Sequence, residues 1–96
     1  MTVERVIDVQ ATEDAFKRML ESAFPDRPTS IDGDSMRIGE GDDAVRVQLH
    51  DQPDRQLGSL ELPMERVRFL FDGQSEADAD AFMEEYRTAT MRTGGG

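Results

Sequence analysis

The hydrophobic positions of this chain follow alternating and helical patterns that predict five strands and two helices. Alternation over residues 3–9 predicts a strand with Val3, Ile7 and Val9 on one side. The segment "ATEDAFKRMLESAF" predicts a helix, with Thr12 as its N-cap and Pro25 ending it. Its apolar stripe at helical spacing consists of Phe16, Met19, Leu20 and Ala23.

The middle of the chain predicts four more strands. "SMRIG" and "AVRVQLH" alternate and are separated by the turn "GEGDD", and "DQPDRQ" predicts a loop. "LGSLELP" predicts a strand that ends at Pro63 or lies at an edge, and "RVRFLFDG" predicts the last strand. The predicted core positions of these strands are, in order, Met36, Ile38, Val45, Val47, Leu49, Leu60, Leu62, Val67, Phe69 and Phe71.

A second helix is predicted to close the fold. Ser75 and Asp78 have the spacing of a capping box, and the helix is expected to run to about Met91. Its apolar stripe consists of Ala79, Phe82, Met83, Tyr86 and Thr90. The order β-α-β-β-β-β-α predicts an α+β two-layer sandwich, with two helices on one face of an antiparallel sheet. We expect one domain over residues 1–92 and a flexible glycine tail over residues 93–96.

The charge composition narrows the classes of partner. The 96 residues carry 21 acidic and 11 basic side chains, a net charge of −10, and Lys17 is the only lysine. This composition is typical of a halophilic proteome, or of a GC-rich genome. Because nucleic-acid affinity depends on cationic groups that neutralise phosphates, a nucleic-acid partner is not expected.

The sequence offers no recognisable catalytic centre, metal site or cofactor motif. There is no cysteine, no phosphate-binding glycine motif and no apolar run of membrane-spanning length. The acidic stretch "DGDSMRIGEGDD" fails the EF-hand spacing, because Met36 and Arg37 occupy the positions that need an oxygen ligand and a glycine. His50 beside Asp51 could act as a base, but a surface histidine is the favoured interpretation. We therefore expect a cytoplasmic protein that is not an enzyme, needs no cofactor and has no membrane partner.

The outward side of the predicted sheet is rich in arginine. If the alternation holds, one uncovered face carries Arg37, Arg46, Gln48, His50, Arg66 and Arg68. Such a face could hold an anionic group or an acidic partner through bidentate contacts. The favoured alternative is cross-strand pairing of these arginines with Glu4, Asp8, Glu61 and Glu65. An exposed sheet could also pair two chains, so we expect a monomer or a weak homodimer.

The chain ends in Gly94, Gly95 and Gly96, which suggests a second hypothesis. A slim glycine terminus can enter the active site of an adenylating enzyme, and its carboxylate can then carry sulfur or join a lysine. Under this hypothesis the protein is a carrier or modifier, and its partner is an E1-like adenylating enzyme. The alternative is a helix cap followed by a frayed end.

A family resemblance is carried by "RQLGSLELPMERVRF", the acidic helix after it, and "RTGGG". These segments resemble the C-terminal domain of MoaD-related proteins, which are related to the sulfur-carrying subunit of molybdopterin synthase. In fused members a ubiquitin-like carrier comes first and a domain like this one follows. The resemblance spans nearly the whole chain and is most specific at residues 57–63 and 94–96. It implies a non-catalytic accessory domain that associates with a sulfur-carrier protein or with molybdopterin biology.

The departures from that family limit what the resemblance implies. The ubiquitin-like carrier domain is missing, and a single strand here precedes the first helix instead of the hairpin that begins a ubiquitin-like fold. The glycine tail follows a helix rather than a final strand. The predicted fold therefore does not itself imply that Gly96 is activated.

Overall fold

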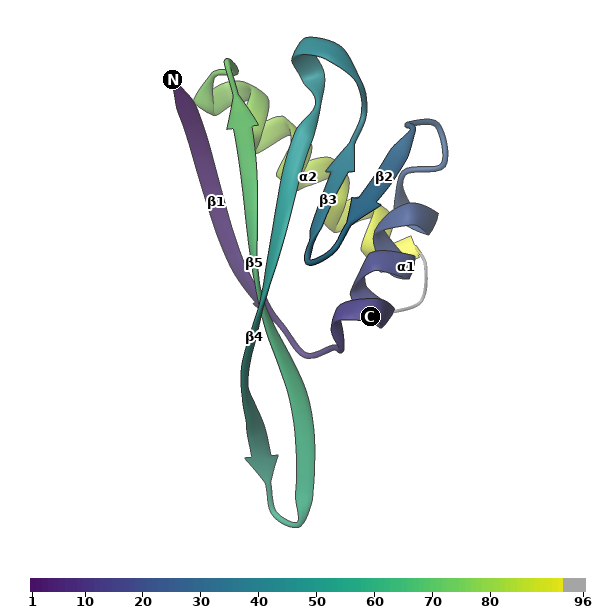
Figure 1. Cartoon of the computed structure of the whole chain (residues 1–96), viewed down its shortest axis with the longest axis vertical. Helices are drawn as coiled ribbons and strands as arrows, with labels where there is room; N and C mark the ends of the chain where they lie inside the picture. Colours follow the sequence, from purple (N-terminus) through teal and green to yellow (C-terminus); the bar gives the residue numbers. More distant parts are fainter. Residues whose placement is uncertain (93–96) are drawn as a thin grey trace.

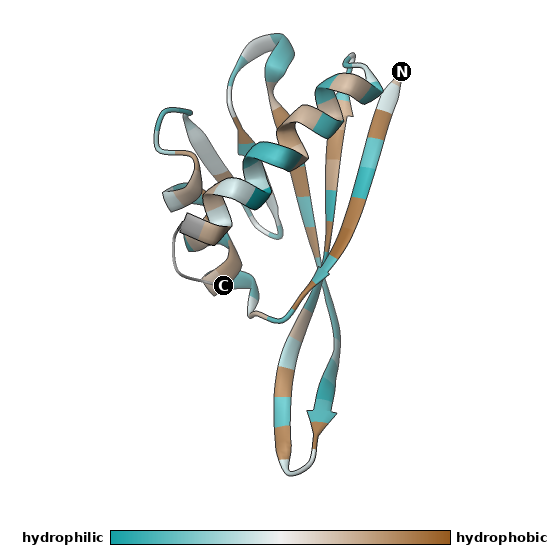
Figure 2. Ribbon diagram, turned by 180° about the vertical axis from the view of Figure 1, so that it is seen from behind, coloured by the Kyte–Doolittle hydropathy of each residue, from teal (hydrophilic) through white to brown (hydrophobic). Residues whose placement is uncertain are grey.

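One antiparallel sheet with two helices makes up the computed structural model, which describes residues 1–92. The strands are β1 (Thr2–Val9), β2 (Thr29–Asp32), β3 (Ser35–Ile38), β4 (Val45–Leu57) and β5 (Leu60–Asp72), and the helices are α1 (Glu13–Ala23) and α2 (Glu76–Arg92). The spatial strand order is β1-β5-β4-β3-β2, and both helices lie on the same face (Figures 1 and 2). The predicted α+β class and element order are confirmed. The predicted glycine tail, residues 93–96, lies outside the described residues.

Both helices begin at the residues that the sequence predicts. The Thr12 side chain accepts a hydrogen bond from the Ala15 backbone N–H at 3.2 Å. In the capping box, the Asp78 N–H donates to Ser75 Oγ at 3.1 Å and the Ser75 N–H donates to Asp78 Oδ2 at 3.0 Å. These bonds satisfy backbone donors that the first helical turn leaves without partners. They therefore fix where each helix starts relative to the sheet.

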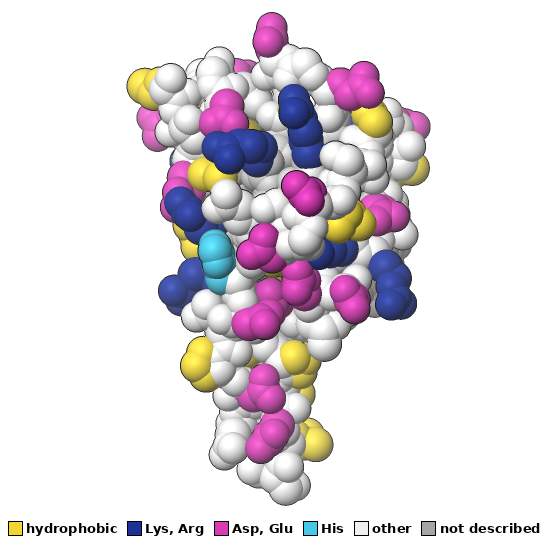
Figure 3. Space-filling model, viewed as in Figure 1, with side chains coloured by type: hydrophobic (Ala, Val, Ile, Leu, Met, Phe, Trp, Pro, Cys, Tyr) yellow, Lys and Arg dark blue, Asp and Glu magenta, His cyan; other side chains and the backbone are white. Residues whose placement is uncertain are grey.

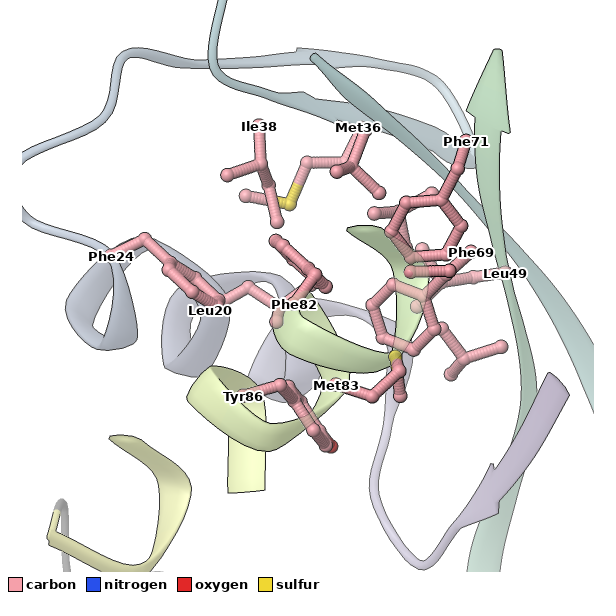
Figure 4. Close-up of a cluster of buried hydrophobic side chains, with 14 of the residues drawn as sticks. Leu20, Phe24, Met36, Ile38, Leu49, Phe69, Phe71, Phe82, Met83 and Tyr86 are labelled. Carbon is pink, nitrogen blue, oxygen red and sulfur yellow. The ribbon is translucent and has the colours of Figure 1, made fainter. Parts of the chain in front are cut away.

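The core lies between the helices and the sheet and is largely aromatic (Figure 4). The rings of Phe24 and Phe82 stack with centroids 5.0 Å apart, and Phe69 contacts Tyr86 with centroids 5.5 Å apart. Each buried aromatic side chain contributes about 2–3 kcal/mol by leaving water. Most predicted core positions are buried, and Met19, Ala23 and Thr90 are half-buried at its margin.

The strands are divided differently from the prediction. Thr29–Asp32 forms an edge strand, β2, that was not predicted. "DQPDRQ" was expected to be a loop, but it belongs to β4, and the two strands expected over "LGSLELP" and "RVRFLFDG" are one strand, β5. The predicted element order still holds because the prediction misses β2 but counts β5 as two strands, so the total number of strands is the same.

The most distinctive feature of the fold is a two-stranded arm formed by residues 52–64. β1 pairs with β5 only as far as Val9 and Glu65, and beyond that point β4 and β5 pair only with each other. The hairpin projects from the body, and its strands cross in both views because it is strongly twisted (Figures 1 and 2). The molecule consequently measures 45 Å along its long axis and 27 and 25 Å along the others.

The arm corrects the prediction that Leu60 and Leu62 point into the core. Leu60 is 61% exposed and Leu62 is only half-buried, and neither belongs to the hydrophobic core. Leu60 and Leu62 lie on the same side of β5 as Arg66 and Arg68, which is the side that the helices leave open. The prediction placed them in the core because it divided β5 into two strands and gave each strand its own alternation.

Candidate functional site

The arginines predicted to share a face lie together on the side of the sheet that the helices leave open. Three cross-strand rows define this helix-free face: Glu4–Leu70–Arg46, Val6–Arg68–Gln48 and Asp8–Arg66–His50. β3 extends the face, because Arg37 is registered with Arg46. Figure 3 views this face and shows basic and acidic side chains intermixed on the body, above the narrow arm.

Three of these arginines are held by carboxylates on the same face. Arg46 Nε lies 2.5 Å from Asp72 Oδ2, and Arg66 Nε lies 2.9 Å from Asp8 Oδ1. Arg68 contacts Glu4 Oε2 at 2.6 Å and also donates to Gln48 Oε1 at 3.2 Å. The predicted pairing with Glu4 and Asp8 is therefore confirmed. The predicted pairing with Glu61 and Glu65 is wrong, since Glu61 lies on the arm and Glu65 faces the helices.

These contacts keep the carboxylates ionised. Hydrogen bonds from Arg68 and Arg66 lower the pKa values of Glu4 and Asp8, respectively. Hydrogen bonds from Arg46 and Thr2 lower the pKa of Asp72 to about 2. The face carries four arginines and four carboxylates, namely Arg37, Arg46, Arg66, Arg68, Glu4, Asp8, Asp32 and Asp72. It is thus balanced in charge, although the whole chain carries −10.

Arg37 is the arginine of this face that has no carboxylate within ion-pair distance among the described residues. It lines an open hollow of about 240 Å³ together with Ser30, Ser35, Arg46 and Gln48. An anion in this hollow would meet one available guanidinium, because Arg46 is already bound to Asp72, but it would also meet the Asp32 carboxylate, which lines the same hollow. The arrangement therefore does not favour an anion over the carboxylate that is already there.

His50 and Asp51 do not form the acid–base pair that their adjacency allows. Successive strand residues point to opposite faces, so His50 lies exposed on the helix-free face while Asp51 lies on the helix side. The cross-strand neighbour of His50 is Arg66, and that of Asp51 is Glu65. This geometry agrees with the favoured interpretation of His50 as a surface side chain.

The arm is built from a β-bulge and a tight turn. Gln52 is paired with Met64 and Arg55 with Leu62, so β4 has one residue more than β5 between these pairs. The ladder is interrupted there, which accommodates Pro53 in a strand. At the tip, Gly58 has φ +64° and Ser59 does not have positive φ, the pattern of a type II′ turn.

One side of the arm carries four apolar side chains, which we name the leucine face: Leu57, Leu60, Leu62 and Met64. Gln52 and Arg55 lie on the same side, opposite Met64 and Leu62 respectively. Leu60, Leu62 and Met64 alternate along β5, and Leu57 is directly opposite Leu60. Leu57 is 53% exposed and Leu60 is 61% exposed. Gln56 and Glu61 form a pair on the other side of the hairpin. An isolated two-stranded hairpin is marginally stable in water, so an exposed apolar face on one is a feature that needs an explanation.

A buried carboxyl group lies on the helix side of the sheet where the arm begins. Glu65 is 4% exposed, and its Oε1 has no hydrogen-bond partner among the described residues. Burial, a side-chain hydrogen bond with Asp51, and the charges of Asp51 and Glu13 raise the pKa of Glu65 to about 7, and Lys17 opposes the shift. Lys17 is itself buried, lies 2.9 Å from Glu13 Oε1 and donates to the Gly33 carbonyl.

This carboxyl group was missed because Glu65 was grouped with the outward-facing acids. The sequence did contain the signal, since Glu65 is two residues before Val67 and four before Phe69 and must share their face. No group of three or more His, Cys, Asp or Glu side chains among the described residues is arranged to hold a metal ion.

No protein-family model, curated protein or solved structure matches this chain. The residues that carry the MoaD-related resemblance fall in two places. Residues 57–63 form the tip of the arm, whereas Gly94, Gly95 and Gly96 lie outside the described residues. No helix within the described part of the chain is both long and apolar enough to span a membrane.

Proposed function

We propose that this protein is a non-catalytic interaction module that binds a protein partner through the leucine face of its arm. The observation that carries the proposal is the exposure of Leu57 and Leu60 on a hairpin that, within residues 1–92, has no third strand and no helix against it. Burial of exposed leucines on a partner is favourable, at about 25 cal/mol per Å² of apolar area. The same burial gives the arm the packing layer that an isolated hairpin lacks.

The helix-free face supports this role because most of its charged side chains are already paired with one another. Three of its four arginines are held by Asp72, Asp8 and Glu4, and the fourth, Arg37, lies farther along the face on β3. A partner that docks on the arm can extend over β5 and β4 without burying an unpaired arginine, which would be costly.

The resemblance to the MoaD-related C-terminal domain gives the proposed module a biological setting. Its more specific internal motif, residues 57–63, coincides with the arm tip and includes three residues of the leucine face. An accessory role in sulfur-carrier or molybdopterin biology follows from that resemblance alone. The carrier hypothesis depends on Gly96 and remains a separate proposal, tested by the intact mass of the native protein.

A photoreactive amino acid placed in the arm tests the proposed function. It replaces Leu60 in one variant and Gln56, on the other side of the same hairpin, in the matched control. We expect protein adducts in host cells that are several-fold stronger from position 60 than from position 56. Equal or absent adducts from the two positions would refute the arm as the binding surface.

A further inference from the structure

We infer that the partner of the leucine face is a second copy of this chain, so that two arms pack against each other in a symmetric dimer. This inference rests on the proposed function, because it assigns the occupant of the same surface. In a two-fold dimer one patch contacts its own copy, so the patch must be complementary to itself. Leu57, Leu60, Leu62 and Met64 meet this requirement, since apolar side chains can pack against an identical set.

Charge favours the arm as the place where two copies meet. The chain carries −10, so two bodies repel each other. Residues 52–64 contain only Asp54, Arg55 and Glu61 as charged residues, a net charge of −1. The arm extends about 20 Å, which exceeds the Debye length of about 8–10 Å at physiological salt. Contact at the arms therefore brings together weakly charged surfaces while the acidic bodies stay apart.

The size of the leucine face predicts the strength of the dimer. Two strands about 4.8 Å apart and about 20 Å long present about 200 Å² in projection per copy. If protruding side chains double this area, two copies bury about 800 Å², which is below the roughly 1,000 Å² expected of a stable interface. We therefore expect a weak, reversible dimer, whose dissociation constant depends on packing rather than on area alone.

Salt dependence separates this dimer from an electrostatic association. The leucine face contains no ion pair that salt could screen, and Arg55 is the charged residue registered on that side, opposite Leu62. At an ionic strength of about 0.01 M the Debye length of about 30 Å exceeds the length of the arm, so the acidic bodies repel each other, and added salt screens both this repulsion and that between two copies of Arg55. Dimerisation should therefore strengthen as salt rises. A partner held by complementary charges would dissociate instead.

Sedimentation velocity on the purified full chain, over a concentration series, tests the inference. Wild type should shift from 10.8 kDa toward twice that mass as its concentration rises. Leu60→Lys should weaken the dimer at least about tenfold. The matched control Gln56→Lys adds the same charge to the other side of the hairpin and should change the dissociation constant less than about threefold. Both positions are exposed, and circular dichroism verifies the fold of each variant.

The outcomes separate the inference from the proposed function. A wild-type monomer at all concentrations overturns the inference, as does a dimer that Leu60→Lys and Gln56→Lys affect equally. The latter result would place the contact elsewhere, such as the open edges of β1 or β2. If wild type is monomeric but the photoreactive residue at position 60 captures a different protein, the inference fails and the proposed function stands. If that residue captures nothing, the proposed function fails as well.

Discussion

Replacement of Glu65 by Gln should stabilise the protein at neutral and alkaline pH but not in mild acid. The carboxyl group is 4% exposed, lies across from Asp51 and has a pKa of about 7, against 4.5 for an unperturbed glutamate. A folded-state pKa above the unfolded value means that folding favours the protonated form. Its contribution to stability is complete below pH 4.5 and is lost as the pH rises through about 7.

The size of the stability change follows from the difference between the folded and unfolded pKa values of Glu65. Each pH unit between the two pKa values removes up to about 1.4 kcal/mol, so the full loss is about 3 kcal/mol. About 2 kcal/mol of this loss falls between pH 5.5 and pH 8, a range above the calculated isoelectric point of 4.4. Glutamine is nearly isosteric, remains neutral and can donate a hydrogen bond to the Asp51 carboxylate. The variant should therefore lack this component of the pH dependence.

Urea unfolding of wild type and Glu65→Gln at several pH values measures this difference. The gap between their midpoints should widen by about 1–2 M from pH 5.5 to pH 8. Glu61→Gln provides the matched control, because it removes a carboxylate from the same side of the same strand at an exposed position. Its gap to wild type should stay nearly constant. A constant gap for Glu65→Gln as well would show that Glu65 titrates normally, and the assignment of a buried neutral carboxyl group would be wrong.

Four further changes test the core, a helix cap, the turn and the helix-free face. Phe69→Ala should cost about 3–5 kcal/mol in urea unfolding because it empties the centre of the aromatic core, and a loss below about 1 kcal/mol would contradict that placement. Ser75→Ala should cost about 1 kcal/mol in the same assay through loss of the N-cap, and no loss would argue against the capping box. Gly58→Val should speed amide exchange in the arm and leave the body unchanged, because φ +64° disfavours a β-branched residue; unchanged arm exchange would count against the turn. Arg46→Ala should raise the pKa of Asp72 from about 2 toward its ordinary value of 3.8 in a carboxyl-detected NMR titration, and a pKa that stays near 2 would assign the shift to another group.

The sequence predicted the body of the fold well because its signals there are local. Thr12, Ser75 and Asp78 specify helix starts through hydrogen bonds within a few residues. The alternation of Val45, Val47 and Leu49 requires one side of β4 to face the helices, and these residues are buried. The positions of the face arginines followed from the same alternation.

The arm could not be predicted in this way because local sequence signals interrupt both of its strands. Pro53 and Pro63 favour a loop or a strand end when read locally, yet both lie in the region of the bulge, where the ladder is already interrupted. Leu60 shares its side of β5 with Arg66 and Arg68 and therefore faces away from the core, and this phase becomes visible only when residues 60–72 are recognised as one continuous strand. The buried state of Glu65 likewise depends on α1, which brings Glu13 and Lys17 toward it.

An isotope-filtered NOE experiment on an equal mixture of labelled and unlabelled full-length chain tests the central claim most directly. A chain of 10.8 kDa is small enough for complete methyl assignment, even as a dimer. The account predicts intermolecular NOEs from the methyl groups of Leu57, Leu60 and Leu62, which grow stronger as the protein concentration and the salt concentration rise. A sample that sediments as a dimer but shows intermolecular NOEs only from other residues, or no such NOEs from the arm at any concentration, would contradict it.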